Sequence, residues 1–209
     1  MEANLAKIIW EKTIKDYDKI ADKYAEVREK GWREMEFLFK DFIKPDDFVL
    51  DLGCGNGRFY EAFRDNKADY IGTDPSEKLI EIAKKNYPEA DFQVADAFSL
   101  PFDNNYFDGA YSIAVLHHIP SEELRLKFLA EAARVLKRDG YLILTVWDLN
   151  EKRKQRRFNL LAKLWEMDMD KGDMLLPWYG VRDEYFHAFD LPELVNLAQK
   201  ADLRVVEKG

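Results

Sequence analysis

Hydrophobic and polar positions along this chain alternate between two kinds of segment. Short apolar runs bounded by turn-forming residues are typical of buried strands. Longer segments, in which apolar residues recur every three or four positions, are typical of amphipathic helices. The first pattern predicts strands at 48–52, 70–74, 91–94, 107–113 and 141–146.

Helical patterns fall between these strands. They cover 60–64, 76–86 and 122–136, and Ser76 has the side chain of a helix N-cap. Strand and helix in strict alternation predict an α/β fold with a doubly wound, Rossmann-like, mostly parallel sheet. In such a fold, ligands bind at the carboxyl ends of the strands.

The segments on either side of this core complete a single domain over 1–209. Residues 1–44 are predicted to form an N-terminal helical lid, and residues 45–147 the binding core. An aromatic and charged insertion follows at 148–190, on the side of the substrate. Residues 191–209 contain a last helix and a strand at 203–206, which predicts a sheet of six or seven strands. Because the chain then stops, either the sheet closes differently or it lacks a final antiparallel strand.

Composition narrows the class of protein. The 209 residues are 47% hydrophobic and 34% charged, as in soluble globular proteins. No apolar run approaches the ~18 residues that span a bilayer, and the N-terminus lacks the features of a secretory signal. Cys54 is the single cysteine, which excludes an internal disulfide and a cysteine zinc cluster. These observations predict a cytoplasmic protein with no membrane contact and no metal.

The net charge of −8 argues against non-specific binding to nucleic acid over the whole surface. One segment differs, because residues 152–157 hold five cations in six positions. The segment is either a solvated helix start or loop, or a contact for a polyanion.

The loop after the first predicted strand carries candidate chemistry. Residues 51–57 read Asp-Leu-Gly-Cys-Gly-Asn-Gly, and glycines there let the backbone turn tightly and approach a ligand closely. A phosphate-binding P-loop would need a following lysine, which is absent. A dinucleotide-binding loop would need a third glycine at 58, where this chain has Arg58.

Acidic residues follow three successive predicted strands. Asp74 is placed to accept hydrogen bonds from ribose hydroxyls, and Asp96 from an adenine amino group. Asp51 is placed to meet an ammonium, directly or through water. This set suits a cationic adenosine ligand without phosphate, since a pyrophosphate would be repelled.

The segments 49–57, 71–76, 95–97 and 100–102 together resemble the class I S-adenosylmethionine-dependent methyltransferases. The resemblance covers about residues 45–147. It implies methyl transfer from S-adenosylmethionine, leaving S-adenosylhomocysteine. The implied cofactor-binding residues are Tyr17, Tyr24, Asp51, Gly53, Cys54, Gly55, Asn56, Gly57, Asp74, Pro75, Asp96, Ala97, Ser112 and Ile113.

A narrower resemblance is carried by 17–24, 112–118, 176–178 and 184–189. These segments are similar to the tRNA methyltransferases that esterify 5-carboxymethyluridine at the wobble position. That family has a basic insertion where residues 151–157 stand here, and its eukaryotic members work with a small zinc-binding activator subunit. The resemblance therefore implies tRNA, and in eukaryotes an activator, as partners.

Residue roles follow from this resemblance and from the chemistry. The candidates for catalysis are Arg28, His117, His118 and Tyr185. Arg28 is placed first because a guanidinium binds a carboxylate through a two-pronged fork. Aromatic rings can stack a wobble base. The candidates for substrate binding are Trp32, Arg153, Arg156, Arg157, Trp178 and His187.

Structural roles compete with these assignments. Tyr17 and Tyr24 can form the buried face of a helix, one of His117 and His118 is expected to be structural, and His187 is more often a packed or hydrogen-bonded histidine than a catalyst. Trp147 is expected in the core.

Two other functions compete as well. The acidic net charge favours a small-molecule methyltransferase for a carboxylate, phenol or amine. A non-catalytic scaffold is disfavoured, because a degenerate site usually loses some of its glycines and acids.

Overall fold

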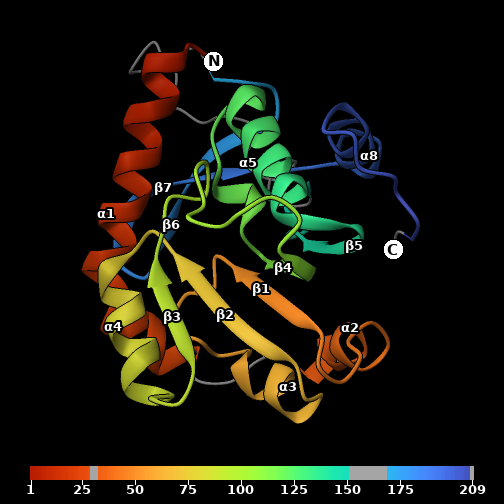
Figure 1. Ribbon diagram of the computed structural model, residues 1–209. Coiled ribbons are helices and arrows are strands. Elements are labelled where there is room, and N and C mark those ends of the chain that lie inside the picture. The colour runs from red at the N-terminus through yellow and green to blue at the C-terminus, as the bar shows by residue number, and fades with distance from the viewer. Residues whose placement is uncertain (29–32, 151–168, 208–209) are drawn as a thin grey trace.

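A sheet of five parallel strands forms the centre of the computed structural model, which describes residues 1–28, 33–150 and 169–207 (Figure 1). The strand order is β3-β2-β1-β4-β5. All four neighbouring pairs are parallel. The strands are β1 (Phe48–Leu52), β2 (Asp69–Asp74), β3 (Asp91–Val94), β4 (Phe107–Ile113) and β5 (Leu136–Thr145).

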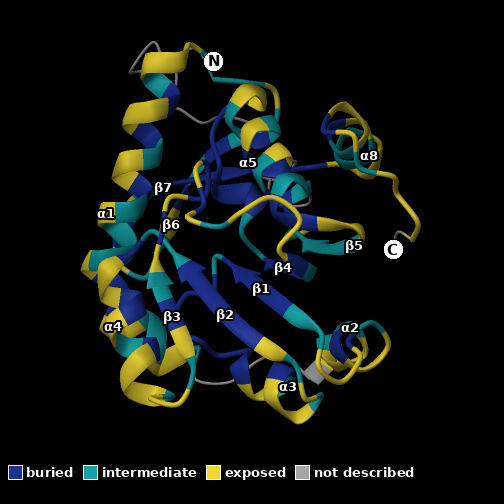
Figure 2. Ribbon diagram, in the orientation of Figure 1, coloured by how far each residue is buried: buried dark blue, intermediate teal, exposed yellow. Residues whose placement is uncertain are grey.

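The central strand β1 is buried because helices cover both faces of the sheet (Figure 2). Side chains of successive strand residues point to opposite faces. Leu50 and Leu52 accordingly pack in one apolar cluster, with residues of α5 (Glu122–Val135) and α8 (Leu191–Lys200). Val49 packs in a second cluster on the other face. That cluster holds residues of α2 (Glu36–Lys40), α3 (Tyr60–Asp65) and α4 (Glu77–Asn86).

These observations confirm the doubly wound parallel fold and the position of the predicted strands. The N-cap at Ser76 is also confirmed, since its side chain accepts a hydrogen bond from the backbone N–H of Leu79. The expected sixth strand at 203–206 is wrong. Those residues belong to no strand, and Val206 is 83% exposed. A strand forms only where a neighbour offers its backbone for pairing, and the described part of the chain provides none at this point.

The insertion after β5 contains a hairpin that the apolar pattern did not predict. The strands β6 (Asp173–Trp178) and β7 (Val181–His187) pair with each other in antiparallel fashion, outside the main sheet. Met174, Leu176 and Phe186 pack with Leu149 in a third apolar cluster, which Trp147 and Trp178 border. The sheet therefore holds five strands among the described residues rather than six or seven, because β6 and β7 form a separate unit.

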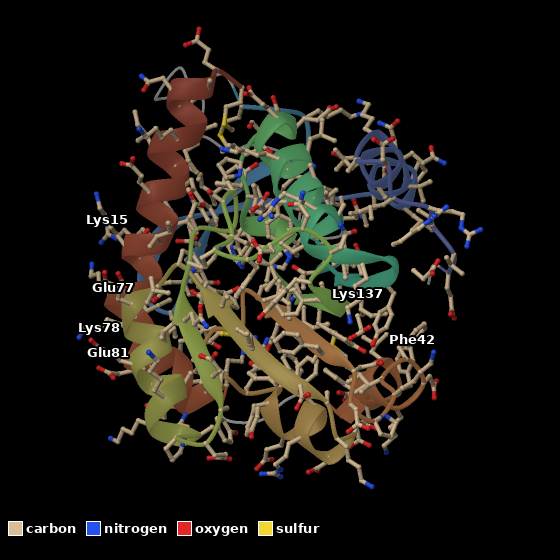
Figure 3. The ribbon with its side chains drawn as sticks, viewed as in Figure 1. Lys15, Phe42, Glu77, Lys78, Glu81 and Lys137 are labelled. Atoms are coloured by element: carbon tan, nitrogen blue, oxygen red, sulfur yellow. The ribbon has the colours of Figure 1, made fainter. Side chains whose placement is uncertain are left out.

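The first helix, α1 (Ala3–Val27), runs past both the main sheet and the hairpin (Figure 1). It contacts both α4 and β7. Figure 3 shows Lys15 of α1 and, below it along the same edge of the molecule, Glu77, Lys78 and Glu81 of α4. A single turn, η1 (Arg33–Met35), follows before α2. Of the helices described, none is both long and apolar enough to cross a membrane.

Candidate active site

A cavity of about 720 Å³, including its open mouth, lies where the carboxyl ends of β1, β2 and β4 meet the inner face of α1. This is the edge of the sheet at which a doubly wound fold binds its ligand. Nine of the residues predicted to bind the cofactor line it: Tyr17, Tyr24, Gly53, Cys54, Gly55, Asp74, Pro75, Ala97 and Ile113. His118 also lines the cavity.

The glycine loop begins at a position that leaves no room for a side chain. Gly53 has φ +85°, and a Cβ at that position would lie 2.4 Å from Cγ2 of Val115. The backbone N–H groups of Gly53 and Cys54 both donate to the carbonyl of Thr73, at 2.7 and 2.9 Å. The loop is therefore held against the ends of β2 and β4 with bare backbone lining the cavity. This shape fits a ligand that must approach the chain closely.

Asp74, at the end of β2, links this loop to the start of α4. Its carboxylate accepts from the N–H of Gly55 at 3.0 Å and from the N–H of Ser76 at 2.9 Å. Burial raises the pKa of Asp74 to about 6, against the lowering effect of the two backbone donors. The carboxylate that lines the cavity is thus positioned before any ligand binds.

Asp51 lies behind the cavity instead of in its wall. It is 1% exposed and accepts a hydrogen bond from the Tyr70 hydroxyl at 3.1 Å. Burial raises its pKa to about 7, although the Tyr70 bond lowers it. Asp51 is therefore not among the lining residues, and its carboxyl group is held by the Tyr70 hydroxyl behind the wall.

Four other predicted cofactor residues also lie outside the lining. Asn56 donates from its side chain to the carbonyl of Arg28 at 3.0 Å, which ties the glycine loop to the end of α1. Gly57 packs against Phe92, and Ser112 is fully buried. Asp96 is exposed, and its carboxylate accepts from the N–H of Phe98 at 2.9 Å, next to Ala97 in the wall.

His118 joins α1 to the hairpin beside the cavity. Its Nε2 lies 3.0 Å from the Tyr17 hydroxyl, and its Nδ1 lies 3.4 Å from the carbonyl of Tyr185. Burial lowers the pKa of His118 to about 4, so the ring is neutral at physiological pH. A neutral ring with a carbonyl at Nδ1 donates there and accepts the Tyr17 proton at Nε2.

His117 has a different environment. It is fully buried, stacks on Trp147 and Phe186, and lies 3.4 Å through Nδ1 from the backbone N–H of Trp147. Burial holds its pKa well below the usual range. Of the two histidines, His118 faces the cavity and His117 supports the core beneath it.

Arg28 directly follows the last residue of α1 and lies beside two tryptophan rings. Its guanidinium carbon lies 5.9 Å from the ring centre of Trp147 and 6.0 Å from that of Trp178. The two tryptophan rings are themselves 4.8 Å apart. We call Arg28, Trp147 and Trp178 the acceptor-side cluster. Trp147, which we expected in the core, thus also belongs to this cluster.

Tyr185 and His187 lie away from the cavity, in a buried polar network. The Tyr185 hydroxyl accepts from Arg125 at 2.8 Å and donates to Asp173 at 2.5 Å. His187 bridges Asp173 at 2.6 Å and Glu193 at 2.9 Å. The network joins the hairpin to α5 and α8, so the geometry gives both residues a structural role. The remaining candidates, Trp32, Arg153, Arg156 and Arg157, lie outside the described residues.

Among the residues that were not candidates from the sequence, three line the cavity from α1 and one lies beside Tyr24. Trp10, Thr13 and Ile14 of α1 line the cavity. Tyr179, at the tip of the hairpin, lies 6.1 Å from Tyr24, measured between ring centres. The helical spacing of α1 carried a signal for the first three, but nothing in the sequence indicated Tyr179, because its position depends on the unpredicted hairpin.

The doubly wound sheet, the glycine loop after β1 and the carboxylate at the end of β2 define the class as a class I methyltransferase domain. Residues 50–144 match a family model described as a methyltransferase domain. The chain shares its fold with a solved S-adenosylmethionine-dependent methyltransferase from Methanosarcina mazei, at 24% identity and TM-score 0.68, over 82% of this chain and 84% of that one. A putative methyltransferase from Haloferax volcanii, solved with the Trm112 methyltransferase activator, gives 20% identity and TM-score 0.66, over 91% and 76%.

Sequence relatives define the family more closely. The chain is 31% identical to the tRNA (carboxymethyluridine(34)-5-O)-methyltransferase of Schizosaccharomyces pombe, over 92% of this chain and 89% of the relative. It is 32% identical to the mouse probable tRNA methyltransferase 9B, over 78% of this chain but 32% of that longer protein. The chain belongs to the tRNA (carboxymethyluridine(34)-5-O)-methyltransferase family and is an S-adenosylmethionine-dependent methyltransferase.

The raised pKa values of Asp74 and Asp51 predict how cofactor binding depends on pH. A sulfonium cation favours the ionised acids, so S-adenosylmethionine must bind more tightly as pH rises through about 6 and then about 7. We expect the affinity to fall by up to ~10-fold per pH unit between about pH 7 and 6, where Asp51 protonates, and more steeply below about pH 6, where Asp74 protonates as well. Isothermal titration between about pH 5.5 and 7.5 measures this. Asp74→Asn should bind more weakly and with a flatter pH profile, and a wild-type affinity independent of pH would contradict the assignment.

The network around Tyr185 yields a second prediction. Tyr185→Phe removes the hydroxyl between Arg125 and Asp173 and leaves both buried groups with one partner fewer. We expect a loss of ~1–3 kcal/mol in the free energy of unfolding, measured in urea. Binding of S-adenosylhomocysteine should stay within about two-fold of wild type, because the hydroxyl lies outside the cavity. Full stability together with lost methyl transfer would instead return Tyr185 to the catalytic residues.

Proposed function

We propose that this enzyme esterifies the carboxymethyl group of a modified wobble uridine in tRNA. The observation that carries the proposal is the acceptor-side cluster, which combines a cation with two aromatic rings next to the cofactor cavity. An arginine suits a carboxylate, and aromatic rings suit a base held out of an RNA loop. The acceptors named for the sequence relatives support the same substrate.

The reaction requires no strong general acid or general base from the protein. Bound S-adenosylmethionine supplies an electrophilic methyl group on a sulfonium. A carboxymethyl acceptor is already an anion near neutral pH, so its oxygen needs no proton removed. The chain's own residues therefore contribute mainly alignment and exclusion of water.

Arg28 is the residue we propose to orient the acceptor carboxylate. It follows the last turn of α1, one turn beyond Tyr24, which lines the cofactor cavity. Its carbonyl also receives the hydrogen bond from Asn56 of the glycine loop. The same short stretch of backbone thus fixes the acceptor's cation relative to the cofactor loop. A two-pronged hydrogen bond from a guanidinium sets direction as well as position.

His118 adds no positive charge to the cavity at neutral pH. Since its pKa is about 4, it presents a neutral ring near the place where the sulfonium binds. Its bond to Tyr17 also holds α1 against the hairpin. We propose that α1 serves as a lid, whose closure over the cofactor excludes water from the transfer.

Transfer of labelled methyl from S-adenosylmethionine to tRNA bearing 5-carboxymethyluridine tests this function. Wild type should label that tRNA and leave tRNA without the carboxymethyl group unlabelled. Arg28→Ala should lower kcat/KM by ~10²-fold or more, because the variant loses a charge-assisted, two-pronged bond, whereas Arg28→Lys should recover only part of it. Binding of S-adenosylhomocysteine, measured by titration, controls for folding. Label confined to small carboxylates, phenols or amines would transfer the assignment to a small-molecule methyltransferase.

From the family resemblance, we also propose that this chain works with a small zinc-binding activator subunit. Co-expression of such a subunit with this chain should yield a complex that elutes as one species on size exclusion. Methyl transfer to tRNA per mole of chain should then exceed that of the chain alone. Separate elution with unchanged activity would show that the chain works without it.

A further inference from the structure

The tip of the β6–β7 hairpin holds a tyrosine in a backbone conformation that tyrosine rarely adopts. Trp178 pairs with Val181, so Tyr179 and Gly180 form a two-residue turn. Their φ angles are +42° and +99°. Two positive values are the pattern of a type I′ turn, whose first position favours asparagine, aspartate or glycine. A bulky residue there is an outlier that calls for an explanation.

The contacts of the Tyr179 ring suggest why it occupies this position. Its centre lies 6.1 Å from that of Tyr24 and 4.6 Å from that of Trp178, both edge to face. Tyr24 lines the cofactor cavity, and Trp178 belongs to the acceptor-side cluster. The ring therefore contacts one residue from each of these two groups.

Tyr179 is also half-buried, with space beside it. A Cβ added at Gly180 would meet no heavy atom within 4 Å among the described residues. The other candidate rings pack against fully buried residues, whereas Tyr179 contacts two half-buried rings edge to face. Tyr185 is 1% exposed in the polar network, and Trp147 stacks on His117. Trp178 packs against Trp147 and Phe186.

We propose that Tyr179 is a specificity-determining residue that stacks on the flat heterocyclic base of the acceptor while Arg28 holds its carboxylate. The inference rests on the proposed function and deepens it by naming the stacking partner. A stacked base fixes the plane of the acceptor, and Arg28 fixes the direction of the carboxylate. Together they orient the attacking oxygen toward the cofactor. Stacking on a single ring changes affinity by about 5- to 100-fold when the ring is removed.

Variants at this position separate the ring from the fold. Tyr179→Phe keeps the ring, and Tyr179→Leu keeps apolar bulk at the same positive φ without an aromatic face. We expect Tyr179→Phe to stay within about two-fold of the wild-type KM for tRNA, and Tyr179→Leu to raise it ~10-fold. The Kd for S-adenosylhomocysteine should stay within about two-fold in both. Tyr179→Asn suits the turn, so it should raise KM equally with no loss in Tm.

A matched control lies at the opposite edge of the sheet. Tyr106 is 40% exposed just before β4, and Tyr106→Leu should leave the KM for tRNA unchanged. Equal KM values for Tyr179→Leu and Tyr179→Phe would overturn this inference, as would a KM that rises only in variants with a lower Tm. A wild-type protein that transfers no label to tRNA would overturn the proposed function and this inference with it. The two failures are therefore distinguishable.

Discussion

The close approach of the glycine loop to the ends of β2 and β4 is the constraint on which the site depends. At Gly53, a single added carbon would collide with Val115, and the positive φ already disfavours any side chain. Because the loop lies this close, its N–H groups reach the Thr73 carbonyl and the Asp74 carboxylate. The same closeness leaves bare backbone facing the cavity. Loosening this one contact would move the acid, the loop and the start of α4 together.

The second element of the design is one long helix, which lines the cofactor cavity and ends next to the arginine that we propose for acceptor binding. The inner face of α1 supplies Tyr17 and Tyr24 to the cofactor cavity, and the residue after its last turn is Arg28. Several hydrogen bonds hold it in place. His118 binds Tyr17, Asn56 binds the Arg28 carbonyl, and Ser76 donates to Asp18 at 2.6 Å. The tyrosines of the cofactor cavity and the proposed acceptor cation are thus anchored to the same helix. This arrangement suits a reaction that depends on alignment.

Much of the fold and half of the site followed from local sequence. Each central strand is a short run of apolar residues, and each glycine or acid of the cofactor site lies within a few residues of a strand end. Such features need no knowledge of distant contacts, since parallel strands bring their carboxyl ends to one edge. The hairpin was missed because its strands carry Asp173, Tyr185 and His187, whose burial depends on partners in α5 and α8. From the sequence alone, a polar residue is predicted to be exposed unless its hydrogen-bond partner is known.

The alternation of strands and helices predicted the class of fold, and the glycine loop with its acids predicted the methyl donor, because parallel strands bring such short motifs to one edge of the sheet. The family followed from the resemblance carried by segments 17–24, 112–118, 176–178 and 184–189. Tertiary structure alone decided which of His117 and His118 meets the cavity, since one 3-10 turn at the end of β4 points the two rings in different directions. It also showed that Tyr185 and His187 do not line the cavity, because their side chains hydrogen-bond to Asp173 and, for Tyr185, to Arg125 in a buried network. It also brought Tyr179 beside Tyr24, because a two-residue turn with two positive φ angles carries the ring to the end of α1.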